Sequence, residues 1–383
     1  MAKVRFGDVV KEYKGKIDQK NNPYEFYVAG DHMDTDDLTI RRRGRFATDD
    51  VGPAFIREFK KGQVLYGSRR TYLRKIAVAD FDGVTANTTF VLETKDESIL
   101  RQRLLPFIMY TESFTEWSIK KSKGSTNPYV LFKDLADYEF ELPDIGKQDE
   151  LVELLWSMID TRDAYNNLIV SIDELVKSQF IEVFGDPVEN EKEWPVFPLS
   201  KIASSRLGKM LDKKKQTGLY QRKYLANANV QWFSFDLNDL NQMDFNEDDQ
   251  QEFSLVNGDL LVCEGGEIGR CAVWREEIND CYFQKAIHRV RCNTEMILPE
   301  YLAHSFFYHS QKNGFADIVS SKATIAHLPG DKLKAMGVIV PPIELQQQFV
   351  SFVEQSDKSK FELRKTLAEL TAMYKRIIQE KLV

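Results

Sequence analysis

Positive charge gathers in short clusters, and these clusters are the clearest chemical feature of the sequence. The densest lies in a polar, turn-rich stretch and comprises Arg41, Arg42, Arg43 and Arg45. Arginine and lysine side chains bind phosphate oxygens, and an arginine can also bind the edge of a guanine base. The alternative interpretation is a run of solvated surface charge. We favour phosphate contact.

Other polar and basic side chains fall in predicted loops along the chain. Further candidate contacts are Ser68, Arg69, Arg70, Arg74, Lys120, Lys121, Lys123, Lys209, Lys213, Lys214, Lys215, Arg222, Lys223, Arg270 and Lys322. The arginines at 69, 70 and 74 are the better base readers, because a loop held by two strands presents its side chains rigidly. The lysine runs suit phosphates, contacts that position a protein without specifying a sequence.

Two acidic residues, Glu264 and Glu267, stand in another predicted loop tip. A carboxylate is repelled by phosphate but can accept a hydrogen bond from the amino group of cytosine. The alternative is an ion pair with Arg270 or Arg275. Both interpretations stay open at this point.

Motifs for enzymatic chemistry are incomplete. The Asn-Pro-Tyr runs that begin at Asn22 and Asn127 each lack one proline of an amino-methyltransferase motif, and no glycine-rich strand-to-helix loop accompanies them. Gly265–Gly269 lacks the Lys-Ser/Thr of a phosphate-binding loop. The histidines of the second half have no ligand spacing. The sequence therefore predicts no catalytic site and no metal site.

A long helix in the middle of the chain must position these side chains. From Gln148 to Val183, apolar residues recur at spacings of three and four, which indicates a helix with one buried seam. Gly185 and Pro187 then end it, since glycine adopts the left-handed cap conformation and proline cannot continue a helix. The expected seam is Leu151, Leu154, Met158, Tyr165, Leu168, Ile172 and Leu175.

A second helix of this kind follows Pro342. Its expected seam is Phe349, Val353, Leu363, Leu367, Leu370, Tyr374 and Ile377, interrupted by Ser356 and Lys360. The first helix region, Asp144 to Asp186, has ten acidic and three basic residues, whereas Glu344 to Val383 has six acidic and seven basic residues. Two amphipathic helices can bury both seams by packing together. We therefore expect an antiparallel pair; the alternative is that each helix packs on its own globular part.

The remainder of the chain reads as one globular module present twice. Lys61–Tyr66 matches Asn257–Val262 at an offset of 196, and Gln148 matches Gln346 at an offset of 198. Each copy has two apolar runs around a short tip, which predicts a hairpin. Residues 98–114 and 299–311 look helical. The predicted class is α+β, with two pseudo-symmetric globular domains separated by a pair of long antiparallel helices.

Composition sets outer limits on this interpretation. The chain has 383 residues and a net charge of −7. Its share of hydrophobic residues, 43%, is that of ordinary globular proteins. Its four cysteines form no CxxC pair, which predicts reduced thiols. The N-terminal stretch lacks the apolar core of a signal peptide, so we expect a cytoplasmic protein without membrane contact.

An ordered set of motifs resembles the specificity (S) subunits of type I restriction–modification systems over essentially the full length. The motifs are Phe184-Gly185-Asp186-Pro187 with Asn190, Trp194, Leu199 and Ile202, the runs 256–272 and 280–286, and the closing run 340–348. The resemblance implies a first target-recognition domain (1–142), a long helix (143–186), a second target-recognition domain (187–340) and a C-terminal helix (341–383).

The same resemblance implies a non-catalytic subunit that binds double-stranded DNA. Each target-recognition domain would read one half of an asymmetric bipartite target. The paired helices would set the gap and dock two modification (methyltransferase) subunits, which restriction/translocase subunits join. S-adenosylmethionine, ATP and Mg would bind in those partners, and no cofactor in this chain. The alternative is a single-chain methyltransferase or nuclease with fused recognition domains, for which 383 residues leave no catalytic domain.

Overall fold

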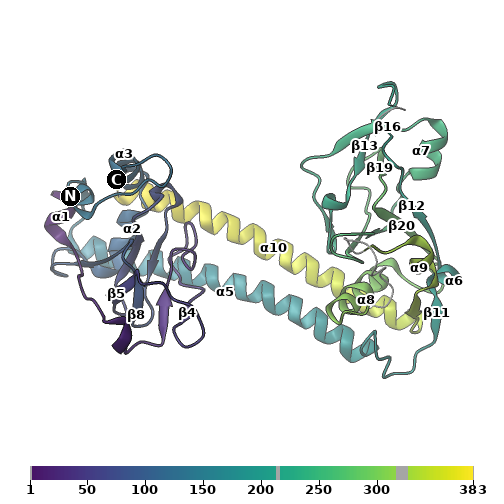
Figure 1. Cartoon of the computed structure of the whole chain (residues 1–383), viewed down its shortest axis with the longest axis horizontal. Helices are drawn as coiled ribbons and strands as arrows, with labels where there is room; N and C mark the ends of the chain where they lie inside the picture. The colour runs from purple at the N-terminus through teal and green to yellow at the C-terminus, as the bar shows by residue number, and fades with distance from the viewer. Residues whose placement is uncertain (1, 213–215, 316–326, 383) are drawn as a thin grey trace. The chain divides into compact units, whose positions relative to one another are not determined.

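The computed structural model describes residues 2–212, 216–315 and 327–382. Its backbone contacts divide the chain into two units (Figure 1). Unit 1 comprises Met1–Asn167 and Leu363–Val383, and unit 2 comprises Leu168–Glu362. Each unit therefore contains one module, the first (residues 1–142) or the second (residues 187–340), and a part of each long helix.

The first module consists of short strands and helices. Its strands are β1 (Ala2–Arg5), β2 (Val10–Glu12), β3 (Phe26–Val28), β4 (Gly44–Arg45), β5 (Phe55–Phe59), β6 (Val64–Gly67), β7 (Ile76–Val78), β8 (Gly83–Ala86), β9 (Thr89–Thr94) and β10 (Glu139–Leu142). Its α-helices are α1 (Phe6–Val9), α2 (Leu105–Met109), α3 (Glu112–Lys121) and α4 (Phe132–Ala136). The strands form sheets of order β2-β9-β6-β7 and β4-β3-β8-β5, and β1 pairs with β10.

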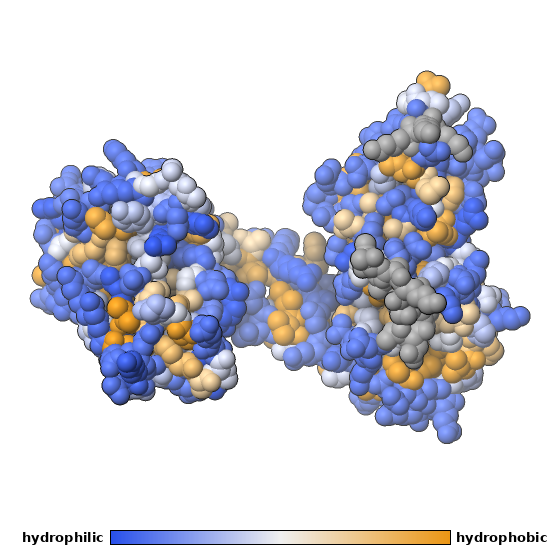
Figure 2. Space-filling model, viewed as in Figure 1, coloured by the Kyte–Doolittle hydropathy of each residue, from blue (hydrophilic) through white to orange (hydrophobic). Residues whose placement is uncertain are grey.

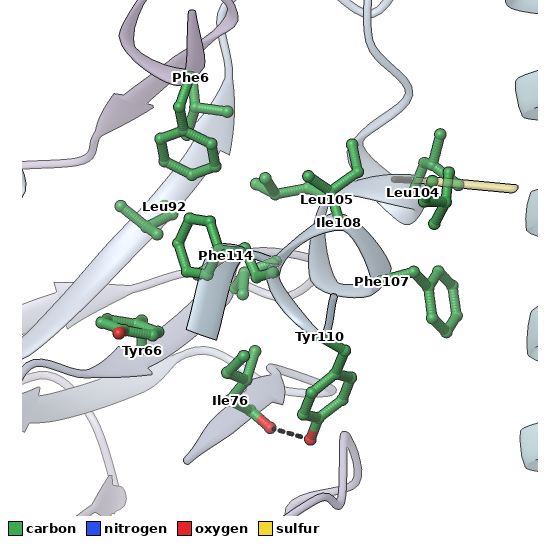
Figure 3. Packing of buried hydrophobic residues seen from close by; sticks show 14 of the residues in the cluster. Phe6, Tyr66, Ile76, Leu92, Leu104, Leu105, Phe107, Ile108, Tyr110 and Phe114 are labelled. Carbon is green, nitrogen blue, oxygen red and sulfur yellow. Dashed lines mark hydrogen bonds between the residues drawn. The ribbon is translucent and has the colours of Figure 1, made fainter. Parts of the chain in front are cut away.

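The core of the first module lies between the β2-β9-β6-β7 sheet and the helices α2 and α3 (Figure 3). Tyr110 closes one side of it, where its hydroxyl donates to the Ile76 carbonyl at 3.2 Å. The single helix predicted for residues 98–114 is wrong. Thr111 has extended backbone and its hydroxyl accepts from the Phe114 N–H, so it ends one helix region and caps α3.

The second module repeats this plan. Its strands are β11 (Val196–Pro198), β12 (Ala203–Leu207), β13 (Gln221–Leu225), β14 (Val230–Gln231), β15 (Ser234–Phe235), β16 (Asn241–Asp244), β17 (Leu260–Cys263), β18 (Cys271–Val273), β19 (Cys281–Phe283), β20 (Ile287–Cys292) and β21 (Gly337–Ile339). Its α-helices are α6 (Leu199–Ile202), α7 (Glu247–Phe253), α8 (Pro299–Gln311) and α9 (Gly330–Ala335). The sheets have the orders β12-β20-β17-β18 and β16-β13-β19, and β11 pairs with β21 while β14 pairs with β15. The helix predicted for residues 299–311 is confirmed.

The predicted duplication is confirmed by the matching sheets. The order β2-β9-β6-β7 corresponds to β12-β20-β17-β18, and both predicted hairpins are present as β6–β7 and β17–β18. Buried glutamines repeat as well. The Gln148 side chain donates to the Pro143 carbonyl, and that of Gln346 donates to the Pro341 carbonyl, at 2.9 and 2.8 Å. Each glutamine also bonds a backbone segment of its module, so both long helices start from the same anchor.

The two long helices are α5 (Ile145–Phe184) and α10 (Ile343–Leu382), each of 40 residues. In unit 1, Val152, Leu155 and Ile159 of α5 share a core with Ile378 and Leu382 of α10. In unit 2, the other end of α5 meets the beginning of α10. There the Phe180 and Phe349 rings lie 5.4 Å apart between centroids. The helices thus run antiparallel within each unit, and the modules pack on them too.

The predicted seam of α10 is confirmed, since each of its apolar members is buried or half-buried. The predicted seam of α5 is wrong at three of its seven positions. Leu154, Leu168 and Leu175 are exposed, the latter two at 49% and 52%. The residues that directly follow Leu154 and Leu175 in the sequence, Leu155 and Val176, are buried instead. The sevenfold spacing fits either row, and only packing against α10 selects the inner one. Within the described residues, no helix has the length and apolar character needed to cross a membrane.

Candidate nucleic-acid interface

The tip of the β6–β7 hairpin lies against a second loop of the first module. Arg70 adopts left-handed backbone with φ of 50°, and its N–H donates to the Pro128 carbonyl at 2.7 Å. The Val130 N–H donates in turn to the Ser68 carbonyl at 2.9 Å. Lys123 is tied to this loop by paired backbone bonds with Tyr129. The structure thus joins the predicted base-reading tip to the predicted phosphate-binding loop.

Some side chains at this edge already have partners within the protein, and others have none. Within the described residues, Arg69, Arg70 and Lys120 are exposed and their side chains have no hydrogen-bond or ion-pair partner. Lys121 lies over the Trp117 ring at 4.7 Å, and Lys123 pairs with Asp134 at 3.0 Å. Ser68 is buried, and its hydroxyl donates to the Thr88 carbonyl at 2.6 Å. The exposed cations can reach a ligand, whereas Ser68 shapes the tip.

The arginine cluster at residues 41–45 is largely engaged within unit 1. Arg41 pairs with Asp37 and with Asp163 of α5, at 2.7 and 2.5 Å. Arg162 of α5 also pairs with Asp37 at 2.7 Å, so this network fastens the loop to the helix. Burial by itself raises the pKa of Asp37, but hydrogen bonds from Arg41 and the Thr39 N–H and the nearby arginine charges lower it overall.

The other arginines of this region have partners of their own. Arg42 pairs with Asp34, Arg45 pairs with Glu25, and the Arg43 guanidinium lies 3.8 Å from the centroid of the Phe26 ring. Arg74 pairs with Asp36 at 2.8 Å and donates to the Tyr110 carbonyl. Arg41, Arg42, Arg43 and Arg45 are exposed, whereas Arg74 is half-buried. Contact of these five with a ligand stays a prediction.

The β17–β18 tip of the second module is held at equivalent places. The Glu264 N–H donates to the Ala286 carbonyl at 2.9 Å, and the Leu328 N–H donates to the Glu264 carbonyl at 2.7 Å. Gly269, with φ of 79°, lies where a Cβ atom would fall 2.4 Å from the Phe315 ring. Both modules therefore assemble one edge from a hairpin tip, the turn before the next strand and the segment before the next helix.

The two carboxylates of this tip have different surroundings. Glu267 accepts from the Trp232 indole N–H at 2.6 Å and lies 3.6 Å from Arg270, which supports the ion-pair interpretation for this residue. Arg270 also donates to Asn227 at 3.1 Å. The Glu264 side chain has no hydrogen-bond or ion-pair partner among the described residues. Glu264 is thus the carboxylate available to a ligand.

Some basic residues of the second module are paired within the protein, and another is exposed. Lys209 donates to Asp249 and to the Asp244 carbonyl, both at 2.5 Å, and Arg222 pairs with Asp280 at 2.9 Å. Lys223 is exposed. The predicted contacts Lys213, Lys214, Lys215 and Lys322 lie outside the described residues.

The structure adds residues that the sequence interpretation did not select. Asn227 donates to the Gly265 carbonyl at 2.9 Å, and the Lys285 N–H donates to the Lys209 carbonyl at 2.8 Å. The Lys285 side chain is exposed at this edge. The sequence held a signal for Lys285, because this residue lies in the run 280–286, one of the motifs that carry the family resemblance.

Two cysteines and one histidine of the second module have pKa values that burial shifts. Burial raises the pKa of both Cys281 and Cys292 to about 12, and burial lowers the pKa of His304 to about 3. Their neutral forms dominate at neutral pH, so these groups are packed core residues rather than activated nucleophiles or bases. Across the part of the chain that the structure describes, no cluster of His, Cys, Asp and Glu could hold a metal ion.

Comparison with known proteins matches this duplicated architecture. A family model described as the type I restriction modification DNA specificity domain matches residues 1–174 and again residues 191–372. The chain belongs to this family. The two matches correspond to the two copies of module and helix, and the family is the one that the ordered motifs indicated.

Curated relatives in the family are similar over part of their lengths. The EcoDI specificity subunit of Escherichia coli is 25% identical over 182 residues, which cover 46% of this chain and 39% of that protein. The EcoKI specificity subunit of Escherichia coli K12 is 23% identical over 281 residues, covering 67% of this chain and 60% of that protein. The matches therefore span less than two thirds of either relative.

Solved structures share the fold over nearly the whole chain. The type I restriction–modification S subunit from M. genitalium has a TM-score of 0.60 at 14% identity, covering 100% of this chain and 96% of that one. A chain from a structural study of complex assembly and conformational transition in a type I R-M system has a TM-score of 0.61 at 16% identity, with coverage of 98% and 96%. The α+β class with two domains and two long helices is confirmed.

Proposed function

We propose that this chain is the sequence-specific DNA-binding subunit of a type I restriction–modification enzyme. The first module, with its tip at Arg69 and Arg70, reads one half of an asymmetric bipartite target. The second module, with its tip at Glu264, reads the other half. One observation carries this proposal: two modules of the same fold present equivalent edges with different side chains. Cations at one tip and a free carboxylate at the other suit different bases, since arginine favours guanine and glutamate favours cytosine.

The remaining cations serve the phosphate backbone in this proposal. Arg42, Arg43, Arg45, Lys120, Lys121 and Lys123 would hold phosphates beside the first tip, and Lys213–Lys215, Lys223 and Lys322 would do so in the second module. Arg41, Arg74, Lys209 and Arg270 would act mainly by shaping their loops, because carboxylates or carbonyl oxygens already engage them. Phosphate contacts supply affinity, and the tips supply discrimination.

The helices α5 and α10 set the gap between the two half-sites and dock two methyltransferase subunits. The exposed row Leu154, Leu168 and Leu175 supports the docking role, because it leaves a regular apolar stripe on α5 outside the seam. Figure 2 shows hydrophobic residues at the surface of the long helices as well as of both modules. Restriction/translocase subunits join that complex. S-adenosylmethionine, ATP and Mg bind in the partner subunits, which carry out the chemistry.

Mapping of DNA methylation in the source cells tests the proposal. We expect a bipartite asymmetric motif to be methylated in cells with the intact chain and to lose methylation when the chain is deleted. Restoring the chain should restore the same motif. The purified chain alone should transfer no methyl group from S-adenosylmethionine to DNA. Methylation that persists without the chain, or turnover by the chain alone, would contradict the proposal.

A further inference from the structure

A cavity in unit 1 lies where the first module meets both long helices. Its volume is about 170 Å³. Met158 and Ile159 of α5 and Ile378 of α10 are buried and line it with apolar surface. Tyr110 contributes its ring, because its hydroxyl is bonded to the Ile76 carbonyl (Figure 3). A cavity of about 150 Å³ holds one benzene molecule, so this one has room for a single ring-sized apolar group.

The charged side chains that line the same cavity lie nearer the solvent. The Lys375 side chain is 58% exposed, Glu112 is exposed, and Asp36, Arg74 and Arg162 are half-buried. The charged groups therefore stand at the mouth of the cavity, and the buried apolar side chains form its inner end. Such a combination of apolar lining and a few convergent polar groups is typical of small-molecule sites.

The two arginines at the mouth keep donors in reserve. Arg74 Nε lies 2.8 Å from Asp36, and its Nη2 donates to the Tyr110 carbonyl at 2.8 Å. Arg162 Nη2 donates to Asp37 at 2.7 Å. The Nη1 atom of each arginine makes no hydrogen bond within the described residues. Two guanidinium groups with unused N–H donors at one mouth suit a carboxylate, which can accept from both.

The other polar groups of the cavity also offer mainly donors. Lys375 has one contact among the described residues, with Asp36 at 3.4 Å. The Tyr374 hydroxyl has no hydrogen-bond partner there, and burial raises its pKa, so it stays a donor at neutral pH. The Gln379 carbonyl oxygen accepts from the Glu112 N–H at 3.1 Å, which leaves the Gln379 NH₂ group as a donor. The Glu112 carboxylate is the exception, an acceptor without a partner in the described chain. Donors predominate, so the cavity favours an anion.

The second copy fills the equivalent place. Phe233 corresponds to Asp36, because each has left-handed backbone, with φ of 61° and 56°, beside the strand that follows a hairpin tip. The Phe233 ring stacks on His304 at 4.3 Å between centroids. Lys360, the counterpart of Arg162 at the offset of 198, pairs with carboxylates of both long helices at 2.9 and 2.8 Å. The shared fold therefore does not require an open cavity, which depends on the residues of the first copy.

We propose that this cavity binds a small organic carboxylate whose apolar body has the size of one ring. The body lies against the buried apolar side chains, and the carboxylate accepts from Arg74, Arg162 and Lys375 at the mouth. Such a ligand connects the first module to both long helices. The inference goes beyond the proposed DNA-binding function and does not depend on it, since methylation of the bipartite motif is measured separately.

Benzoate is the probe, because it combines one ring with one carboxylate. Isothermal titration of the purified full-length chain should show one site per chain. Benzyl alcohol, benzylamine and inorganic phosphate should each bind at least about tenfold more weakly, since each lacks either the negative charge or the ring. Absence of benzoate binding at millimolar concentrations would overturn the proposal. Equal affinity for benzylamine or for phosphate would do so as well.

Variants locate the site. Lys375→Gln should weaken benzoate binding about threefold, the contribution of an exposed ion pair, whereas Lys365→Gln, at another exposed lysine of α10, is the matched control. Glu112→Gln should tighten binding, because it removes a negative charge from the mouth. Leu370→Phe should abolish binding by filling the cavity, and Met373→Phe, at an exposed residue of the same helix, should not. Thermal unfolding checks the fold of each variant. Equal weakening by the two lysine variants would indicate unspecific attraction and refute the site.

A carboxylate can also come from the side chain of a partner protein, and one further titration separates the two sources. Benzoate is added to the complex that a tagged full-length chain brings from its own cells. It should bind with the affinity measured for the chain alone and release no subunit. If it binds the chain only in isolation, or if its addition releases a subunit, then a protein carboxylate fills the cavity and the proposal of a free ligand is overturned.

Discussion

Substitutions five residues apart on α5 should separate stability from assembly. The Phe180 ring is fully buried in unit 2 among Phe184, Tyr301, Tyr308 and Phe349, at centroid distances of 5.1, 5.8, 4.7 and 5.4 Å. Leu175 of the same helix is 52% exposed. Truncation of the first side chain leaves a cavity, whereas truncation of the second removes only surface area.

The magnitudes follow from this difference in burial. Phe180→Ala should lower the free energy of unfolding by roughly 3–5 kcal/mol, the usual cost of removing a buried phenylalanine ring. For a unit of this size the melting temperature should fall by about 10 °C. A double variant, Leu168→Ala with Leu175→Ala, should change the free energy of unfolding by less than about 1 kcal/mol. We expect the double variant to lose methyltransferase subunits instead.

Two measurements on the full-length chain decide the matter. Thermal and urea unfolding give the stabilities, and co-purification through a tag on the chain gives the methyltransferase content. Glu174→Ala, at an exposed polar residue of the same turn, is the matched control and should affect neither. If the double leucine variant is destabilised as strongly as Phe180→Ala, then Leu168 and Leu175 are buried in the seam and our assignment of the α5 faces is refuted.

Other perturbations test the tips, the gap and the network at Asp37. Arg69→Ala or Arg70→Ala should relax methylation specificity in one half-site only, by roughly 1–3 kcal/mol of base discrimination; relaxation in both halves would contradict separate reading. Deletion of residues 166–172 should alter the gap of the methylated motif or abolish methylation, and an unchanged gap would argue against the helices as the spacer. The folded-state pKa of Asp37 lies below its ordinary value of 3.8, so its stabilising contribution is present above that pH and is lost as the pH falls through the folded value. Urea unfolding should therefore show Asp37→Asn less stable than the wild type at neutral pH, with the difference shrinking in acid; a difference independent of pH would refute this.

Much of the architecture could be predicted because it depends on local patterns. The apolar runs around each tip, the segment of strand, proline and glutamine before each helix, and the offset between the copies are all visible in the sequence. They predicted the hairpins β6–β7 and β17–β18 and the correspondence of Gln148 with Gln346, which the structure shows to be equivalent anchors. Strand and helix periodicity is a short-range property, so these features needed no knowledge of partners distant in the chain.

The roles of individual charged residues could not be predicted in this way. Arg41 looked like a phosphate ligand, yet it pairs with Asp163, which lies far away in the sequence. Glu264 and Glu267 looked alike, yet Trp232 and Arg270 engage only Glu267. The partner of a long charged side chain depends on which segments the fold brings within a few ångströms of it. A cluster of charged residues in the sequence does not show which segments those are.

The sequence by itself determined that the chain is a duplicated α+β protein with two long amphipathic helices. The tertiary structure decided which face of α5 is buried and which charged side chains remain exposed. A sevenfold repeat describes neighbouring rows of a helix equally well, and an arginine is equally compatible with a carboxylate or a phosphate. Packing resolves both choices, because burial energy and ion pairing depend on neighbours that only the folded chain supplies.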